Sequence, residues 1–268
     1  MTENRREIVE KQYALLGFDP SCDGEFQAVL SAADLSFLTD FSAYDPKAHT
    51  AADNLIACLY FAKELEQKYR EKGIGRAILT DTLHDLVIWN DSHFRIHGHI
   101  GLDEFPWLSL PFDMKIFRLG RLQYEMSSAD FDIEEAGLHI GDPLLQVHIP
   151  RGGPLTEDEC LGSLAQVKPF FKTFYPDFPS DICVCHSWLL DETLDPLLGS
   201  SSNIRSFRKL FRPVSRNRSD AVLRYTFRWD ATRENVGKFK PSSGFAARLR
   251  DAVADGRDFY EVSGFRPL

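Results

Sequence analysis

Apolar residues recur at helical spacing through the N-terminal part of the chain. Residues 4–16, 50–72 and 78–89 each place apolar side chains three or four positions apart, which is typical of amphipathic helices. Gly73 follows the second segment and predicts that this helix ends there, because glycine accepts the left-handed backbone of a C-cap. Residues 98–111, with two prolines, predict a loop-like connector.

The pattern changes after Lys115. Residues 116–126 alternate between apolar and polar side chains, which predicts one half-buried strand with Arg121, Gln123 and Glu125 on one face. The next pattern predicts a strand, a glycine turn, a helix and a second strand, at residues 144–150, 151–154, 156–174 and 181–190. A strand that leads through a glycine turn into a helix presents backbone N–H groups, which suits anionic or amide-rich ligands.

The remaining segments complete a mixed pattern. Residues 221–229 alternate and predict a strand, residues 201–211 and 244–254 predict helices, and residues 258–264 predict a short final strand. The sequence therefore predicts an α+β protein, with a helical N-terminal domain at residues 1–112 and a second domain with a mixed sheet flanked by helices at residues 113–268.

Composition limits the partners of the chain. It has 268 residues, 43% of them hydrophobic, and a net charge of −9. An acidic protein repels phosphate backbones, which argues against nucleic-acid binding. A basic cluster at residues 205–218 runs against this balance, and a solvated face is its expected role. No apolar run is long enough for a bilayer, so no membrane partner is expected.

The cysteines and the N-terminus predict a cytoplasmic location. The first residues are charged and no apolar segment follows them, so the sequence shows no secretory signal. The five cysteines are an odd number without a disulfide rhythm, which is typical of reduced thiols. Cys183 and Cys185 are expected to be buried small side chains on one face of their strand, with His186 on the other.

Four segments carry a family resemblance: residues 117–125, 147–150, 187–191 and 202–207. In this order they resemble a group of bacterial acyltransferase-like proteins, which carry a helical N-terminal domain and a C-terminal domain similar to the GNAT acyltransferases. The resemblance covers nearly the whole chain. It implies transfer of an acyl group from a pantetheine thioester to an amine, with acyl-CoA or a carrier-protein-bound phosphopantetheine as donor, a small-molecule amine as acceptor and no metal.

The resemblance also implies where the donor binds. In GNAT proteins a central strand splays from its neighbour, and the strand–turn–helix cradles the pyrophosphate. Here that implies roles for Ile149, Arg151, Gly152 and Gly153, with Ser187 and Asn203 reaching the pantetheine. The turn departs from the GNAT pattern, because Pro154 has no N–H to donate.

The helix after this turn begins with acidic residues. Thr156 and Glu159 predict a capping box that satisfies the helix N–H groups, and the carboxylates of Glu157, Asp158 and Glu159 repel phosphate. A carrier-bound pantetheine, which has one phosphate, fits this acidic start better. An acidic carrier protein could then dock on the basic residues Arg205, Arg208, Lys209, Arg212, Arg216 and Arg218.

His148 and Glu125 are the candidate catalytic residues. An imidazole titrates near neutrality, so His148 is a candidate base for the amine, with a buried structural histidine as the alternative. Glu125 could also act as a base or hold a substrate ammonium. The alternative for Glu125 is an ion pair with Arg121 or Arg118, which share its segment.

Two further motifs are interpreted structurally. Residues 70–75 match the GNAT phosphate pattern, but they follow a predicted helix, and a helix–helix corner is expected. His93, His97 and His99 cluster near a helix end, and one helical turn separates the first two, as in metal sites. Surface histidines without a metal are the expectation. The alternative to an enzyme is a degenerate GNAT fold that binds a ligand or partner without catalysis.

Overall fold

A computed structural model describes residues 4–268. The chain divides into two compact units, the first ending at Arg118 and the second spanning Leu119–Leu268. The predicted domain boundary falls at Phe112, the last residue of a helix of the first unit. Among residues 4–268, no helix combines the length and the apolar character needed to cross a membrane.

The first unit is helical, as predicted. Its helices are α1 (Arg5–Leu16), α2 (Asp23–Ala32), α3 (Ala51–Lys72), α4 (Arg76–Leu83), α5 (Asp85–His97) and α6 (Phe105–Phe112). Thr50 and Asp53 form a capping box at the start of α3, and Gly73 ends it with a left-handed backbone (φ 79°). The Gly73 and Ile74 amides donate to carbonyls of the last turn, so residues 70–75 form the expected helix–helix corner.

Two predictions for the first unit are wrong. The segment at 78–89 belongs to two helices, α4 and α5, which meet at His84. Part of the predicted connector at 98–111 is α6, because Phe105, Leu108 and Phe112 are buried at helical spacing. Its Pro106 stands in the first turn, where a missing N–H costs no hydrogen bond.

The second unit is built on a six-stranded mixed sheet with the order β1-β2-β3-β4-β6-β5. The strands are β1 (Ile116–Leu119), β2 (Leu122–Ser128), β3 (Pro143–His148), β4 (Ile182–Ser187), β5 (Arg212–Arg218) and β6 (Tyr260–Pro267). β3 and β4 are parallel, while the β2–β3, β4–β6 and β5–β6 pairs are antiparallel. The predicted fold class, an α+β chain with a mixed sheet, is confirmed.

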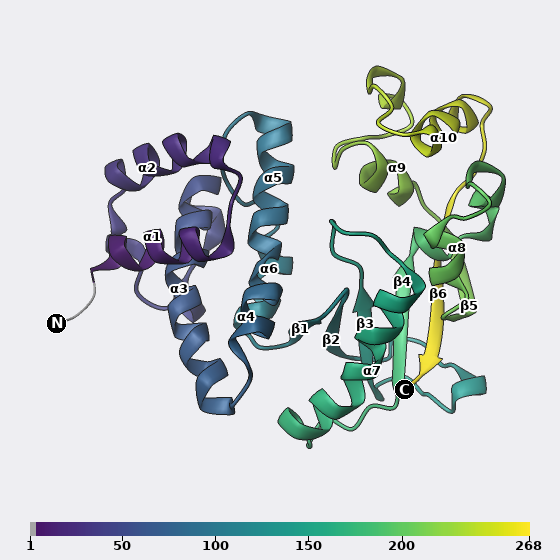
Figure 1. The fold of residues 1–268 in the computed structure, drawn as a ribbon, viewed down its shortest axis with the longest axis horizontal. Helices are drawn as coiled ribbons and strands as arrows, with labels where there is room; N and C mark the ends of the chain where they lie inside the picture. Colours follow the sequence, from purple (N-terminus) through teal and green to yellow (C-terminus); the bar gives the residue numbers. More distant parts are fainter. Residues whose placement is uncertain (1–3) are drawn as a thin grey trace. The chain divides into compact units, whose positions relative to one another are not determined.

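The helices of the second unit lie along this sheet or beyond the end at which β6 begins (Figure 1). They are α7 (Glu157–Phe174), α8 (Asn203–Arg208), α9 (Ala221–Thr226) and α10 (Gly244–Ala254). Helix α7 packs on the face that carries Tyr124, where the Ser163 hydroxyl is 2.9 Å from the Tyr124 hydroxyl. Segment 129–142 contributes to an apolar cluster with Val184 and Phe265. By register, Val184 shares its face with Gln146 and His148.

Two strand predictions for this unit need correction. The predicted single strand at 116–126 is a pair, β1 and β2, separated by Gly120 (φ 74°) and Arg121. The predicted strand at 221–229 is helix α9, because Val222 and Leu223 are adjacent and both fully buried, which a strand with one buried face does not allow. The strand in this part of the chain is β5, which precedes α9 and has every residue exposed.

Candidate active site

The parallel ladder between β3 and β4 is short. The two strands pair at Leu145↔Cys183 and Gln146↔Val184. The ladder ends there, although β3 continues to His148 and β4 to Ser187. On its other edge, β3 stays paired with β2 as far as Gln123↔His148. The two central strands therefore stop pairing with each other at their C-terminal ends, where ligands bind in open α/β sheets.

The two candidate catalytic residues meet at this end of β3. The Nε2 atom of His148 is 2.9 Å from Oε2 of Glu125. Because Gln123 faces His148 and Glu125 faces Gln146, the two side chains are diagonal neighbours on one face. The side chains are 27% and 19% exposed, so the pair is shielded yet within reach of solvent. The alternative interpretation of Glu125 is an ion pair with Arg121 or Arg118. In the structure its carboxylate contacts His148 instead.

Arg121 instead holds the glycine turn. Its Nε donates to the carbonyl of Pro154 at 2.9 Å, and its Nη1 donates to the carbonyl of Pro150 at 3.0 Å. One guanidinium thus fixes both ends of the turn, from the connection between β1 and β2. The alternating pattern placed Arg121 on a strand face, so no signal in the sequence indicated this role.

The turn itself is open and exposed. Gly152 and Gly153 have positive φ angles of 99° and 67°, which other residues rarely adopt. Within residues 4–268, their N–H groups have no hydrogen-bond acceptor. Ile149 is half-buried and Arg151 is exposed. The turn therefore presents backbone donors directly after the end of β3, as predicted.

The capping of α7 is only half of the predicted box. The Thr156 hydroxyl accepts from the Glu159 amide at 3.3 Å and donates to the Glu159 carboxylate at 2.8 Å. The Glu159 carboxylate is therefore occupied by the hydroxyl and does not return to the Thr156 amide. In the described part of the chain, the amides of Glu157 and Asp158 have no acceptor, so two donors of the helix start stay available for a ligand.

A second histidine belongs to the same face. On β6, the residue paired with His186 is Ser263. On β3, His148 lies level with His186, because each is two residues beyond the Gln146↔Val184 pair. The Nδ1 of His186 is 2.7 Å from the Ser263 hydroxyl. Burial against the protein, including the ring of Phe131, lowers the pKa of His186 although its outer edge faces solvent. The sequence placed His186 opposite the cysteines correctly but gave no reason to assign it to the site.

Cys183 and Cys185 are buried free thiols, as predicted. Burial raises the pKa of Cys183 to about 12. A thiol that stays protonated is a poor nucleophile.

Ser187 ends β4, and Asn203 begins α8. The Ser187 hydroxyl accepts from the Leu189 amide at 3.1 Å and so begins the turn after β4. Asn203 is an exposed residue in the first turn of α8. Ser202 takes the N-cap position of this helix.

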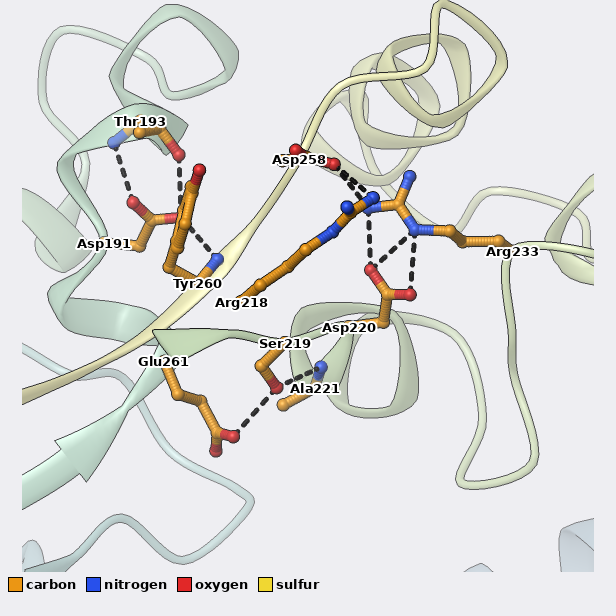
Figure 2. A network of polar contacts seen from close by, with 10 residues as sticks. All are labelled: Asp191, Thr193, Arg218, Ser219, Asp220, Ala221, Arg233, Asp258, Tyr260 and Glu261. Carbon is orange, nitrogen blue, oxygen red and sulfur yellow. Dashed lines mark hydrogen bonds and ion pairs between the residues drawn. The ribbon is translucent and has the colours of Figure 1, made fainter. Parts of the chain in front are cut away.

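Asp191 has a structural role. Its buried carboxylate accepts from the amide and hydroxyl of Thr193 and from the amide of Tyr260, and it thereby fixes the start of β6 (Figure 2). In the same network Arg233 pairs with Asp220, and Arg218 pairs with Asp258. These contacts hold the loops around β5 and β6 together.

The basic cluster is largely neutralised within the chain. Arg205 and Arg208 pair with Asp195, Arg212 pairs with Glu135, and Arg218 pairs with Asp258. Arg216 lies over the ring of Tyr260, with 3.6 Å between the guanidinium carbon and the ring centroid. The basic cluster lies on helix α8 and on the exposed edge strand β5, where most of its arginines form ion pairs within the chain.

A cavity of about 220 Å³ lies next to the end of β4. Its lining combines the apolar residues Leu190, Phe211 and Val214 with four charged residues: Asp191, Glu192, Arg208 and Arg216. Val262, which also lines it, pairs with Ser187 at the end of β4. The cavity therefore lies in the same unit as the short ladder and beside one of its strands.

Comparison with known families decides the class of the protein. Residues 116–266 match the model of a GNAT-like C-terminal domain, and residues 3–114 match the model of an N-acyltransferase N-terminal domain. The chain belongs to the GNAT-like acyltransferase family. The family and the enzyme class implied by the resemblance, an acyltransferase, are thereby confirmed.

Solved structures of similar fold are acyltransferases. One is an acyltransferase in complex with decanoyl-CoA, 23% identical, with a TM-score of 0.79. Another is an acyltransferase in complex with decanoyl-CoA and teicoplanin, 21% identical, with a TM-score of 0.80. Each comparison covers 97% of this chain and 87% of the other. A search among curated proteins finds no match.

Proposed function

We propose that this GNAT-like protein transfers an acyl group from a CoA thioester to an amine of a small molecule, at the C-terminal ends of β3 and β4. The observation that carries the proposal is the β3–β4 ladder, which ends after Gln146↔Val184 while His148 and Glu125 meet beside it. Strands that stop pairing offer their facing edges to the amides of a pantetheine arm. The histidine lies where the thioester would then end.

The reaction needs one base and one set of N–H donors. The amine nitrogen attacks the thioester carbonyl carbon, the C–N bond forms, and the C–S bond breaks to release the CoA thiolate. His148, oriented by Glu125, takes the proton that the amine nitrogen loses. Backbone N–H groups at Ile149 and Arg151 stabilise the negative charge on the carbonyl oxygen. His186 is the second candidate base, since its lowered pKa keeps the imidazole neutral.

CoA is favoured over a carrier protein as the source of the thioester. The amides of Gly152, Gly153, Glu157 and Asp158 are donors suited to a pyrophosphate, despite the nearby carboxylates. Much of the basic cluster that would dock a carrier is engaged in ion pairs. The similar structures with bound decanoyl-CoA support the same donor class. The cavity lined by Leu190 and Arg208 is a candidate for the acyl chain or a phosphate.

The acceptor proposed is a small molecule with a free amine. One similar structure contains teicoplanin besides decanoyl-CoA, which supports an acceptor of this size. A cytoplasmic location, where thiols stay reduced, is supported by five free and buried cysteines.

Calorimetry and thermal shift with acetyl-CoA, octanoyl-CoA, decanoyl-CoA and a phosphopantetheine fragment test this proposal. Binding of an acyl-CoA is expected, and release of free CoA thiol upon addition of an amine panel would establish transfer. Binding of the fragment alone would favour a carrier-bound donor. Tight acyl-CoA binding without thiol release for any amine would favour a ligand-binding protein without catalysis. No binding of any of these would overturn the proposal.

A further inference from the structure

A second group of polar side chains lies in the first unit, at the C-terminal end of α5. His93 and His97 lie one turn apart on this helix, and His99 and Asp103 follow it in the loop before α6. The Nδ1 of His93 is 2.6 Å from Oδ2 of Asp103, and the Nε2 of His97 is 3.6 Å from the same oxygen. The Nε2 of His93 is 3.3 Å from Nδ1 of His99. Three imidazoles thus converge with one carboxylate.

The sequence predicted surface histidines here, and for His93 this is wrong. Its side chain is 5% exposed, whereas those of His97 and Asp103 are 45% and 57% exposed. The backbone of Gly101 fixes the ring from one side, because a Cβ at that position would lie 2.9 Å from Nε2 of His93. The cluster therefore has a rigid, buried member and two members that solvent ions can reach.

We propose that Nδ1 of His93, Nε2 of His97 and Oδ2 of Asp103 bind one divalent transition-metal ion, with Zn²⁺ as the best fit. One ligand atom from each of the three residues lies within 4.8 Å of the other two. A tetrahedral ion with bonds of about 2.0–2.2 Å separates its ligand atoms by about 3.4 Å, close to the His97–Asp103 distance. The closer His93–Asp103 pair must open by less than an ångström. Two imidazoles and one carboxylate are a donor set that zinc commonly takes.

His99 completes the site from outside. Once Nδ1 of His93 binds the ion, its Nε2–H can donate to Nδ1 of His99, which must then carry no proton and give up its bond, 3.2 Å long, to the Ile100 carbonyl. A hydrogen bond to the far nitrogen of a ligating histidine orients the ring and raises its basicity. Water would fill the fourth position. The ion would hold the end of α5 against the loop that leads into α6, as a structural site separate from acyl transfer.

The competing explanation is that His93 and Asp103 form an ordinary hydrogen bond and bind no ion. Metal binding distinguishes the two. Untagged full-length protein is stripped with a chelator and titrated with Zn²⁺ by calorimetry, and bound zinc is counted by elemental analysis. One ion per chain and a rise in Tm are expected. Zinc uptake well below one ion per chain would overturn the proposal.

Variants locate the ion. His97→Ala and Asp103→Asn change exposed ligands and should leave the fold intact, while each lowers zinc affinity by at least about 10-fold. His139→Ala is the matched control, because His139 is 72% exposed and lies in the second unit. An equal loss of affinity in His139→Ala, or none in His97→Ala, would overturn the site.

Cobalt gives a readout of geometry that does not depend on stability or turnover. Co²⁺ bound to the stripped protein should show the intense visible absorption of a tetrahedral ion, and Asp103→Asn should weaken it. The weak spectrum of hexahydrated cobalt, unchanged by protein, would overturn the proposal. The metal ligands belong to the first unit and the proposed acyl-CoA site to the second. Zinc titration and acyl-CoA calorimetry of the full-length protein therefore distinguish failure of the metal site from failure of the proposed function.

Discussion

Each unit of the molecule contains a histidine–carboxylate pair within hydrogen-bond distance, 2.6 Å in the first unit and 2.9 Å in the second, and the two pairs differ in which partner is the more buried. In the His148–Glu125 pair the carboxylate is the more shielded partner, with 19% exposure against 27%. In the His93–Asp103 pair the imidazole is buried to 5% and the carboxylate is 57% exposed. A carboxylate behind an accessible imidazole can orient a base for a substrate. An exposed carboxylate beside a buried imidazole instead leaves a charged oxygen for an ion.

The surroundings of the two pairs sharpen this difference. Register between β2 and β3 fixes His148 and Glu125 next to a turn whose two glycine amides have no acceptor within residues 4–268. Helical spacing and a loop bring further imidazoles to His93. We therefore propose different chemistry for the same residue types, because neighbouring groups decide what each pair can bind. The predictions below test this contrast.

The largest expected effect is that of removing the imidazole of His148. Loss of a general base typically slows catalysis by about 10²–10⁴-fold, so His148→Ala should lower kcat by at least 100-fold, roughly, with little change in donor KM. Glu125→Gln, which keeps the shape and loses the charge, should cost about 10-fold or more. Both are measured as thiol release from the best acyl-CoA and amine.

The control for this experiment is His139→Ala, an exposed histidine of the same unit. It should leave turnover unchanged. A loss below about 10-fold in His148→Ala would remove this residue from the role of base, and a far larger loss in His186→Ala would transfer the role to His186.

Much of the fold follows from local patterns. Helices α1, α3, α7 and α10 begin and end within a residue or so of their predicted positions, because each has clear periodicity and usable caps. Strand β5 could not be predicted in this way. It lies at the edge of the sheet, and its exposed arginines show no apolar alternation. Only its pairing with β6 makes it a strand, and such pairing between distant segments leaves no local pattern.

The candidate active site likewise has one part that local sequence predicts and one part that depends on tertiary structure. The strand, the turn and the helix around Gly152 are consecutive in sequence, and their order was predictable. The contact between His148 and Glu125 depends on which residues of β2 and β3 face each other, and single-strand patterns do not fix that register. The bonds from Arg121 to the turn depend on the hairpin between β1 and β2. Contacts of this kind emerge only from tertiary structure.

Arg121 tests the contrast between the two histidine–carboxylate pairs, because it holds the glycine turn that follows His148 and has no counterpart in the argument for His93. Arg121→Met removes two charge-assisted hydrogen bonds to Pro150 and Pro154 and frees the turn. Donor KM should rise by about 10-fold, and the free energy of unfolding should fall by about 1–2 kcal/mol. Steady-state kinetics with acyl-CoA and urea unfolding measure both. Arg250→Met is the control, since Arg250 pairs only loosely, at 3.7 Å, with Asp251, and an equal effect there would contradict a specific role.

Gly152 tests whether the backbone shape of the turn matters to the donor. A Cβ would meet no atom within 4 Å, so Gly152→Ala acts through its φ of 99° alone. The cost should be about 1 kcal/mol of stability, with a modest rise in donor KM. Gly162→Ala in α7 is the matched control and should raise stability by about 0.5–1 kcal/mol, because its helical backbone suits alanine. Unchanged KM in Gly152→Ala would separate the turn from donor binding.

The smallest expected effect concerns pH and the second histidine of the sheet. Burial lowers the pKa of His186, while Asp130 and Glu261 oppose this shift and His148 adds to it. The folded protein therefore resists protonation of His186, whereas in the unfolded chain the ring takes up a proton below a pH of about 6.5. As pH falls below that value the unfolded state binds more protons, so stability is lost on the acid side and is fully present above it.

His186→Asn should show a smaller fall in Tm than the parent chain between about pH 7.5 and about pH 5.5. His84 and His93 also have lowered pKa values, so part of the acid sensitivity should remain. His139→Asn, which alters an exposed ring, should lose as much Tm as the parent. If His186→Asn does so too, the pKa of His186 does not differ between the folded and unfolded states, and a lowered pKa no longer supports His186 as a second base.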